Sequence, residues 1–357
     1  MYFKYKMQEN LFKGEMVSNR RICPLDKMNV KDRKILYELS KNSRFSISTI
    51  SKKVGLSRDV VSYRLNNMIK DGLVPGFTLF VNTSRLGLIK HVIYLKLQNV
   101  GKDEETKIVD RLVQEKNIVW VTTCSGNWDI GIIILSKDLV NFNQTFNKVM
   151  TICENNLKDY TIETEVEDKS LGLNFLVEGI NVKETEKYFK DGFVKELNNP
   201  SPSENLKVDQ TDIVLLNLLM ANSRMSIADI CAKLRLSAPA VENRIKRLIK
   251  ENIIDGFMSQ ISIQMLGLQW HWVLLRTKNL TEEREKELRH FFKKHPYFTW
   301  LVKTVGKWNF QLSVFARDAI HFREILSELR KEFSDVIADY DSIMIFNQYK
   351  YMHKLEI

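Results

Sequence analysis

The 357-residue chain has few of the features that mark metalloproteins, secreted proteins or membrane proteins. Its four cysteines form no CxxC pair, and none lies near a histidine at a spacing suited to zinc. No apolar run approaches the roughly 20 residues that cross a bilayer. The polar, basic N-terminus has no hydrophobic stretch like that of a signal peptide. We therefore expect a cytoplasmic protein with reduced cysteines, without a metal site and without a cofactor.

The chain contains one long sequence pattern that occurs twice, and the second copy follows the first at an offset of 180 positions. The matching segments are Asp32 and Asp212, Asn42-Ser43-Arg44 and Asn222-Ser223-Arg224, Leu56-Ser57 and Leu236-Ser237, Gly76-Phe77 and Gly256-Phe257, and Leu86-Gly87-Leu88 and Leu266-Gly267-Leu268. The offset is unchanged as far as Gly126-x-Trp128 and Gly306-x-Trp308. The chain is therefore a duplicated two-domain unit, and its function is first a question about that unit.

The first segment of each copy has the pattern of a winged helix-turn-helix. Residues 30–42 carry apolar side chains at helical spacing, Ser46 and Ser57 are suited to cap two further helices, and Gly55 separates those helices. Residues 73–81 then have a composition typical of a strand. Three short helices, a tight turn and a terminal β segment predict a winged helix-turn-helix, and residues 209–263 repeat the pattern.

The second segment of each copy alternates strand, helix, strand, strand, helix, strand. In the first copy we expect these elements at 91–97, 103–115, 119–124, 129–135, 139–155 and 160–166. In the second copy we expect them at 271–277, 282–294, 298–304, 310–315, 319–333 and 336–345. This order predicts a ferredoxin-like domain. The fold class is therefore α+β, with two winged helix-turn-helix domains alternating with two ferredoxin-like βαββαβ domains.

The domain boundaries follow from these patterns. They are a basic N-terminal extension (1–28), a first winged helix-turn-helix (29–82), a first αβ domain (88–178), a connecting helix with a Pro/Ser/Asn-rich linker (179–208), a second winged helix-turn-helix (209–263) and a second αβ domain (268–357). The linker of about thirty residues is long enough for the second copy to fold back. We expect the two αβ domains to pair within the chain as an internal pseudo-dimer, with further association into dimers or larger assemblies left open.

The net charge of +10 suggests an anionic partner, and its distribution suggests where that partner binds. Residues 29–72 hold ten Lys/Arg against four Asp/Glu, whereas residues 209–256 hold seven against six. The αβ segment at 88–178 is acidic, with ten against fourteen. The first helix-turn-helix is thus the main basic segment, and double-stranded DNA is the expected partner.

The helix after Ser57 is the best candidate for contact with DNA, because the second helix of a helix-turn-helix enters the major groove. If Val61 and Leu65 face inward, Arg58 and Asn66 face outward, and these types can bind guanine and adenine. The candidate DNA-binding residues of this copy are Lys52, Lys53, Ser57, Arg58, Asp59, Ser62, Tyr63, Arg64 and Asn66. The alternative is the solvated face of a helix in a protein-interaction module.

The equivalent helix of the second copy is chemically different. Ala238 and Pro239 offer only apolar contacts, and Glu242 repels phosphate, so we expect weaker or differently specific DNA binding there. The candidate DNA-binding residues of this copy are Ser237, Ala238, Asn243, Arg244, Lys246 and Arg247.

As a set, these motifs resemble the Lrp/AsnC (leucine-responsive, feast/famine) transcription regulators. The resemblance covers roughly residues 29–170 and 209–350, and it is most specific in the helix-turn-helix motifs. It implies a sequence-specific DNA-binding transcription regulator that is not an enzyme, with a winged helix-turn-helix before each αβ ligand and oligomerisation (RAM) domain. Members usually carry one copy and pair between chains, whereas here both copies lie in one chain.

The same resemblance suggests a place for a small-molecule effector such as an amino acid. The turn Ser125, Gly126, Asn127, Trp128 and Asp129 resembles the Gly-x-x-Asp turn of the family's second domain. In the second copy Asn309 replaces the acid, so we expect no strong amino-acid binding there, because a neutral amide cannot pair with an ammonium group. The alternative role of Asp129 is that of a turn or strand-start residue.

Two other functions compete with the regulator. An architectural protein that coats DNA with little sequence preference would also be basic and would also use helix-turn-helix domains. Some fused proteins similar to this family decarboxylate siroheme, but the His-Asn-Tyr run that would support such an enzyme is absent ahead of Trp120 and Trp300. The paired His91 and His271 are expected to be structural, and the tryptophans are expected to pack in the core or between the sheets.

Overall fold

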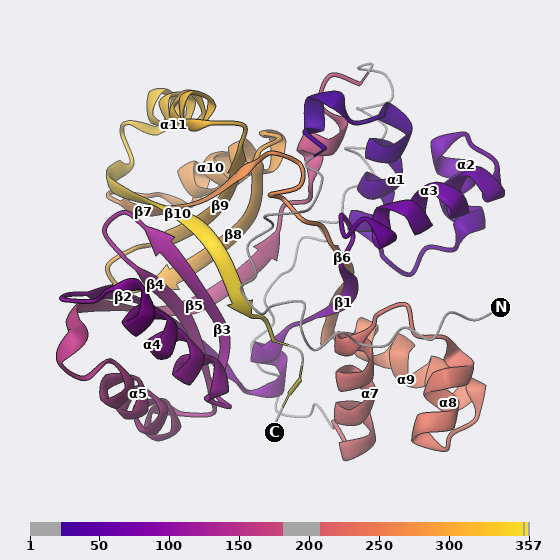
Figure 1. Cartoon of the computed structure of the whole chain (residues 1–357), viewed down its shortest axis with the longest axis horizontal. Coiled ribbons are helices and arrows are strands. Elements are labelled where there is room, and N and C mark those ends of the chain that lie inside the picture. Colours follow the sequence, from indigo (N-terminus) through magenta and orange to yellow (C-terminus); the bar gives the residue numbers. More distant parts are fainter. Residues whose placement is uncertain (1–22, 181–207, 353, 356–357) are drawn as a thin grey trace.

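The computed structural model describes residues 23–180, 208–352 and 354–355 of the chain (Figure 1). The extension up to residue 22 and most of the expected connecting helix and linker lie outside the described residues. Two helix-turn-helix units lie on one side of a large β-barrel in Figure 1. Within the described ranges, helices and strands alternate in the predicted order in both copies.

The two helix-turn-helix units have nearly the predicted boundaries. The helices of the first are α1 (Val30–Lys41), α2 (Ile47–Val54) and α3 (Arg58–Lys70), and those of the second are α7 (Gln210–Ala221), α8 (Ile227–Leu234) and α9 (Ala238–Lys250). Capping explains the starts of α2 and α3, because Ser46 accepts a hydrogen bond from the Thr49 N–H and Ser57 accepts one from the Val60 N–H. Local sequence signals thus set these helix boundaries.

The turn between the second and third helices needs a left-handed residue in both copies. Gly55 provides it in the first copy with φ 69°, but Arg235 occupies the same position in the second copy with φ 56°. A side chain in this region costs on the order of 1 kcal/mol because its Cβ crowds the backbone.

We therefore expect Arg235→Gly to raise the free energy of unfolding by about 0.5–1 kcal/mol. The reverse substitution Gly55→Arg should lower it by about the same amount, although a Cβ at Gly55 would meet no other atom within 4 Å. Urea unfolding of both variants measures the two changes. Equal destabilisation by both would show that the turn conformation does not matter.

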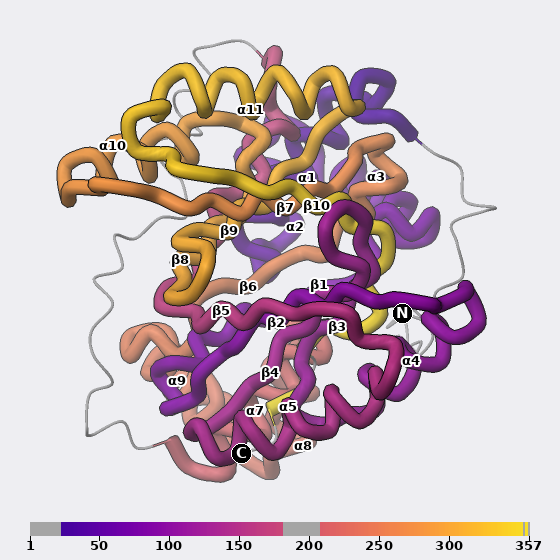
Figure 2. Tube along the Cα trace, turned by 90° about the vertical axis from the view of Figure 1, so that its left-hand side faces the viewer, coloured from indigo at the N-terminus to yellow at the C-terminus, as the bar shows by residue number. Residues whose placement is uncertain are grey.

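The αβ segments form one closed barrel rather than two separate sheets. The first copy supplies β2 (Ile89–Leu97), α4 (Lys102–Gln114), β3 (Ile118–Ser125), β4 (Ile130–Ser136), α5 (Leu139–Cys153) and β5 (Leu157–Ser170). The second copy supplies β7 (Gln269–Thr277), α10 (Glu282–Lys294), β8 (Phe298–Val305), β9 (Phe310–Ala316), α11 (Ala319–Phe333) and β10 (Ile337–Lys350). The strand order β10-β3-β4-β2-β5-β8-β9-β7 closes on itself, with the αβ segment of the second copy above that of the first in Figure 2. The predicted internal pseudo-dimer is confirmed.

The barrel has two seams, which are the places where a strand of one copy pairs with a strand of the other. Pairing at these seams explains why two strands are longer than predicted. The first part of β5 pairs with β2, and the rest pairs with β8 of the other copy, from Thr164 opposite Val305 to Ser170 opposite Trp300. Strand β10 divides in the same way between β7 and β3, with Met344 opposite Ser125. These pairings are related by the same 180-residue offset, so the chain has an internal pseudo-twofold axis.

The β segment that follows each helix-turn-helix also pairs across the copies. Strand β1 (Gly76–Val81) runs antiparallel to β6 (Ile254–Gln260), and Thr78 lies opposite Met258, its own equivalent. The wing is therefore a two-stranded ribbon shared by both units, lying between them in Figure 1. Strand β1 begins at Gly76 rather than at the predicted residue 73, because the Val74 N–H donates to the Met68 carbonyl of α3 and Pro75 has no N–H to pair with another strand.

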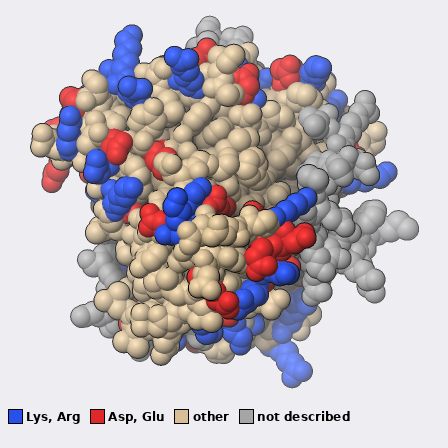
Figure 3. Space-filling model, turned by 60° about the vertical axis from the view of Figure 1, so that its left-hand side comes forward, with Lys and Arg blue, Asp and Glu red and all other residues tan. Residues whose placement is uncertain are grey.

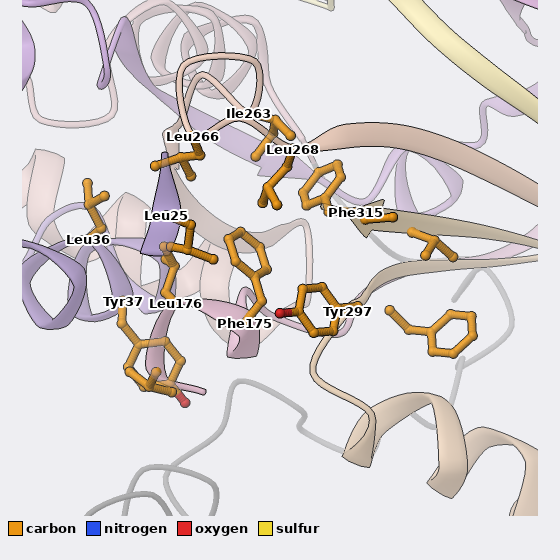
Figure 4. Packing of buried hydrophobic residues seen from close by; sticks show 14 of the residues in the cluster. Leu25, Leu36, Tyr37, Phe175, Leu176, Ile263, Leu266, Leu268, Tyr297 and Phe315 are labelled. Atoms are coloured by element: carbon orange, nitrogen blue, oxygen red, sulfur yellow. The ribbon is translucent and has the colours of Figure 1, made fainter. Parts of the chain in front are cut away.

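Each helix-turn-helix packs against the αβ domain of the other copy. Leu25, Leu36 and Tyr37 pack with Leu266 and Phe315 in one buried cluster (Figure 4). The second helix-turn-helix packs in the same way on Leu86, Leu88 and Leu135 of the first copy. The cluster in Figure 4 also contains Phe175, whose equivalent, Leu355, exchanges two hydrogen bonds with Asn217. In the part of the chain that the structure describes, the two copies are thus intertwined in both their helix-turn-helix and their αβ parts.

The inward faces of the barrel strands are filled with aromatic side chains. Trp120 and Trp272 stack with their ring centroids 4.8 Å apart, and Tyr94 lies edge-on to Trp272 at 5.9 Å. Trp128 and Trp308 are buried in the same cluster. The prediction that the tryptophans pack in the core or between the sheets is confirmed.

The matched histidines lie on the outer faces of their strands, under the helices. His91 packs against Phe142 of α5, and its two ring nitrogens lie 3.1 and 3.2 Å from the hydroxyls of Thr164 and Ser136. His271 stacks on Phe322 of α11 at 3.9 Å. Burial lowers the pKa of both rings, that of His271 to about 4. Their predicted structural role is confirmed.

The depressed pKa makes His271 a source of acid instability. The unfolded ring binds a proton near pH 6.5 and the folded ring does so only near pH 4, so stability is lost as pH falls through this window. We expect His271→Asn to reduce the loss of unfolding free energy between pH 7 and pH 5 by about 2 kcal/mol. Urea unfolding at both pH values measures it, and the exposed His290→Asn serves as the control. An unchanged pH dependence in His271→Asn would contradict the assignment.

One seam of the barrel contains a buried cluster of charges. The Lys90 ammonium pairs with the Asp168 carboxylate and lies 3.3 Å from Glu165 Oε2, and the Trp300 indole N–H donates to Asp168. Burial raises the pKa of Glu165 to about 7, with Lys90 opposing the shift and Asp168 adding to it. In the second copy the equivalent positions hold the uncharged Trp270, Ile345 and Gln348.

Candidate nucleic-acid interface

The recognition helix of the first copy, α3, presents the side chains that the sequence assigned to DNA. Val61, Leu65 and Met68 are buried against α1 and α2. On the opposite side Arg58, Asp59, Tyr63 and Asn66 are exposed, Ser62 is half-buried, and Ser57 caps the helix. Tyr63 is 69% exposed, which is unusual for a tyrosine that only packs the core. The predicted orientation of this helix is confirmed, whereas the contacts to DNA stay a prediction.

Two cations that the sequence assigned to DNA are held by acids of the same unit. Arg64 Nη1 lies 2.9 and 3.0 Å from the two carboxylate oxygens of Asp32 on α1. Lys53 Nζ lies 3.3 Å from the buried carboxylate of Glu38. These contacts tie α3 and α2 to α1, so Arg64 and Lys53 stabilise the fold of the first helix-turn-helix unit. Lys52 and Arg58 are exposed beside them.

The recognition helix of the second copy, α9, has a different exposed surface on the same frame. Ala238, Pro239, Glu242, Asn243 and Lys246 are exposed or partly exposed, and Ser237 stands at the N-cap. Arg244 lies 2.7 Å from Asp209 and from Asp212, and Arg247 also pairs with Asp212. Two of the six predicted DNA contacts in this copy are therefore arginines engaged with acids of α7 and its N-cap.

The motif Asn-Ser-Arg, which stood out in the sequence of both copies, joins the two helix-turn-helix units. The hydroxyls of Ser43 and Ser223 are 2.7 Å apart on the pseudo-twofold axis. Arg44 donates to the carbonyls of Ser223 at 2.7 Å and Met225 at 3.2 Å, and Arg224 donates to those of Ser43 and Phe45. We call these two serines and two arginines the junction. Sequence reasoning missed this role, although identical residues at equivalent positions are what a symmetric contact needs.

The junction is completed by the shared ribbon. The Ser43 N–H donates to the Phe257 carbonyl at 2.8 Å, and the Ser223 N–H donates to the Phe77 carbonyl at 3.1 Å. The Arg44 guanidinium lies 5.5 Å from the Phe257 ring, and that of Arg224 lies 5.2 Å from the Phe77 ring. The two helix-turn-helix units are thus held together by direct hydrogen bonds between their own residues.

The turn assigned to an effector is engaged with the protein itself. As predicted, it faces the other αβ domain, because a Cβ on Gly126 would lie 2.9 Å from the Ser342 carbonyl oxygen. The Asp129 carboxylate accepts the Leu97 N–H at 2.7 Å and pairs with Lys96 at 3.1 Å. Ser125, Gly126 and Asn127 are exposed, and Trp128 is buried in the barrel.

The equivalent turn of the second copy shows that the acid is not required for this role. Asn309 Oδ1 accepts the Thr277 N–H at 2.7 Å, which is the same bond that Asp129 makes to Leu97. A Cβ on Gly306 would collide with the carboxylate of Glu163, which also accepts the Trp308 N–H at 3.2 Å. The exchange of acid for amide therefore conserves the local structure.

The face of the barrel seen in Figure 3 is electrostatically mixed. Over the barrel side, Lys/Arg and Asp/Glu side chains stand next to one another rather than in a field of one sign (Figure 3). In the part of the chain that the structure describes, no helix is long and apolar enough to cross a membrane. Within the same residues, no three His, Cys, Asp or Glu side chains gather in a way that could hold a metal ion.

Comparison with known proteins gives the same class as the fold and the reader helices. The winged helix-turn-helix DNA-binding family matches residues 28–74 and 208–255. An uncharacterized HTH-type transcriptional regulator of Pyrococcus abyssi is 32% identical over 111 residues, which are 30% of this chain and 69% of that protein. The proline dehydrogenase transcriptional activator of Rhodobacter capsulatus is 29% identical over 130 residues, 35% of this chain and 82% of its own. These proteins define the class as DNA-binding transcription regulators.

Among solved structures, the siroheme decarboxylase NirDL matches 92% of this chain and 94% of its own, with a TM-score of 0.58 and 9% identity. This likeness shows the fold alone. An AsnC family transcriptional regulator from Agrobacterium tumefaciens matches 39% of this chain and 91% of its own, with a TM-score of 0.36 and 18% identity. The chain belongs to the Lrp/AsnC family, in a tandem form that carries both copies of the family's two-domain unit.

Proposed function

We propose that this regulator binds duplex DNA as a single chain, with α3 and α9 entering the major groove. The observation that carries the proposal is the junction, which fixes two helix-turn-helix units on one side of the barrel. A homodimer would need two chains to place two such helices on a duplex, whereas the duplicated chain contains both. The basic α3 unit supplies most of the favourable charge.

Affinity measurements at stated salt concentrations test this function. We expect binding to weaken steeply as salt rises, because phosphate contacts release counterions. We also expect a selected operator to be bound about 1,000-fold or more tightly than random duplex. A ratio close to one at every salt concentration would favour the architectural coating protein, and no binding to duplex would remove both proposals.

The contacts of the two Gly-x-Trp turns support a structural role in preference to an amino-acid effector site. Asp129 and Asn309 each accept a hydrogen bond from a backbone N–H of the same copy. Glu163 accepts the hydrogen bond of the Trp308 N–H, so this donor is already used within the protein. Calorimetry against the twenty amino acids tests the alternative at Ser125–Asp129. A heat of binding that Asp129→Asn abolishes would place the effector at this turn.

The packing of the barrel also supports the regulator over a siroheme-type enzyme. A tetrapyrrole between the sheets would have to displace the stacked Trp120 and Trp272 and the buried Tyr94, so these residues do not fit the group. His91 is held by two hydroxyls and His271 by the Gln269 amide at 3.2 Å. Titration with an iron–uroporphyrin, followed by absorbance in the haem region, should show no bound species.

A further inference from the structure

The residues that hold the pseudo-twofold frame are the same in both copies. The Ser and Arg of the junction, the Phe of the ribbon, the buried Val of the recognition helix and the Asp–Arg pair behind it are repeated at the 180-residue offset. These pairs are Ser43 and Ser223, Arg44 and Arg224, Phe77 and Phe257, Val61 and Val241, Asp32 and Asp212, and Arg64 and Arg244. The two recognition helices are therefore held in place by equivalent residues.

Most outward residues of the same two helices differ between the copies. Five outward positions in the first nine residues of each helix carry different residues in the two copies, whereas the exposed Lys70 and Lys250 at the helix ends are the same. The pairs are Arg58 and Ala238, Asp59 and Pro239, Ser62 and Glu242, Tyr63 and Asn243, and Asn66 and Lys246. Identical residues therefore join the two units, whereas these five pairs of outward side chains give the two recognition helices different surfaces.

These two surfaces match different bases. On α3, Arg58 suits guanine and Asn66 suits adenine, while Asp59 can accept a hydrogen bond from cytosine. On α9, Ala238 and Pro239 suit the methyl group of thymine, and Glu242 would accept from cytosine at a position where α3 has a serine. A regulator built from two identical subunits presents the same surface twice and so fits an inverted repeat. This chain presents two different surfaces in the same symmetric frame.

We propose that the chain recognises an asymmetric operator, made of two different half-sites at a fixed spacing, and binds it in one orientation. This inference rests on the proposed DNA binding through α3 and α9. The junction sets the spacing between the half-sites. The five pairs of side chains that differ between α3 and α9 set the sequences of the half-sites. Because the junction is symmetric, the orientation on the duplex is decided by residues that differ between the two helix-turn-helix units, above all the five outward pairs.

Selection of bound sequences from a pool of random duplexes tests the proposal directly. The duplexes should be long enough for two half-sites, about 25 base pairs, so that one chain covers each. We expect an enriched sequence whose two halves are not inverted repeats of each other. Enrichment of an inverted repeat would overturn the asymmetric operator while leaving DNA binding intact. An absence of enrichment, with no binding above that to random duplex, would instead overturn the proposed function.

A sharper test replaces the five outward residues of one recognition helix by those of the other. A first variant carries the α9 surface on both helices, by Arg58→Ala, Asp59→Pro, Ser62→Glu, Tyr63→Asn and Asn66→Lys. The reciprocal variant carries the α3 surface on both, by Ala238→Arg, Pro239→Asp, Glu242→Ser, Asn243→Tyr and Lys246→Asn. All ten side chains lie outside the buried core, and the proline of the first variant falls in the first turn of a helix, where proline is tolerated.

We expect each exchanged variant to prefer an inverted repeat of the half-site that it now reads twice. Its affinity for that repeat should exceed its affinity for the wild-type operator by about tenfold or more, since mismatched base pairs are costly. Wild-type protein should prefer the asymmetric operator over both repeats by a similar factor. Unchanged preferences in both variants, with helical content and thermal midpoints like those of the wild type, would overturn the proposal.

Discussion

Replacing Lys90 by methionine is expected to lower the free energy of unfolding by about 3–5 kcal/mol. The substitution leaves Asp168 and Glu165 buried at the seam between β5 and β8 without the ammonium group that pairs with both. The carboxylate of Asp168 then lacks its cation and its hydrogen bond from Lys90, at a place where strands of both copies meet, so the whole barrel should be affected. Urea unfolding followed by far-UV circular dichroism measures the change.

The control for this prediction is Lys96→Met in the neighbouring part of the same strand. Lys96 also pairs with a carboxylate, that of Asp129, but its side chain is 31% exposed. Solvent screening should limit the cost of losing this pair to about 1 kcal/mol or less. Similar losses in the two variants would show that the Lys90 cluster does not differ in energy from a surface ion pair.

Replacing Arg58 by alanine is expected to weaken binding to a selected operator by about 1–3 kcal/mol and to relax its sequence preference. Asn66→Ala should behave alike, because both side chains are exposed on α3 and can each bind one base through two hydrogen bonds. Fluorescence anisotropy with matched and single-mismatch duplexes measures both effects. Lys52→Ala should instead weaken binding to all sequences alike and reduce the salt dependence.

The matched variants in the second copy are Asn243→Ala and Lys246→Ala on α9. They should weaken binding less than the α3 variants, because the second unit carries almost no net positive charge and places Glu242 toward the DNA. If both α9 variants caused losses as large as those expected for α3 while Arg58→Ala had no effect, the assignment of α3 as the main reader would be wrong.

Local signals in the sequence were sufficient for the helices and for the orientation of the reader. The N-cap serines and the apolar spacing of Val61, Leu65 and Met68 act within one or two turns, so their structural consequence can be read from neighbouring residues. The duplication also implied correctly that the αβ domains pair within the chain, because a repeated unit that normally pairs between chains has its partner nearby.

The cross-copy contacts could not be read in the same way. Alternation along β5 shows that it is a strand but not that its second half pairs with β8, because hydrogen-bond partners leave no mark on a strand's own pattern. Likewise Arg64 and Arg58 look equally suited to phosphate or base, and only the position of Asp32 shows that Arg64 is engaged. The sequence likewise does not show the Leu97 N–H that the Asp129 carboxylate accepts, whereas binding of an effector at this turn stays a prediction.

The most direct test of DNA binding by a single chain is a hydroxyl-radical footprint of a complex that contains one chain per duplex. Two protected regions are expected on one face of the operator, separated by a whole number of helical turns of about 10–10.5 base pairs. Arg58→Ala should weaken protection of one region more than the other. A single protected region at this stoichiometry, or protection that appears only with two chains per duplex, would contradict the central claim that one chain places both recognition helices on DNA.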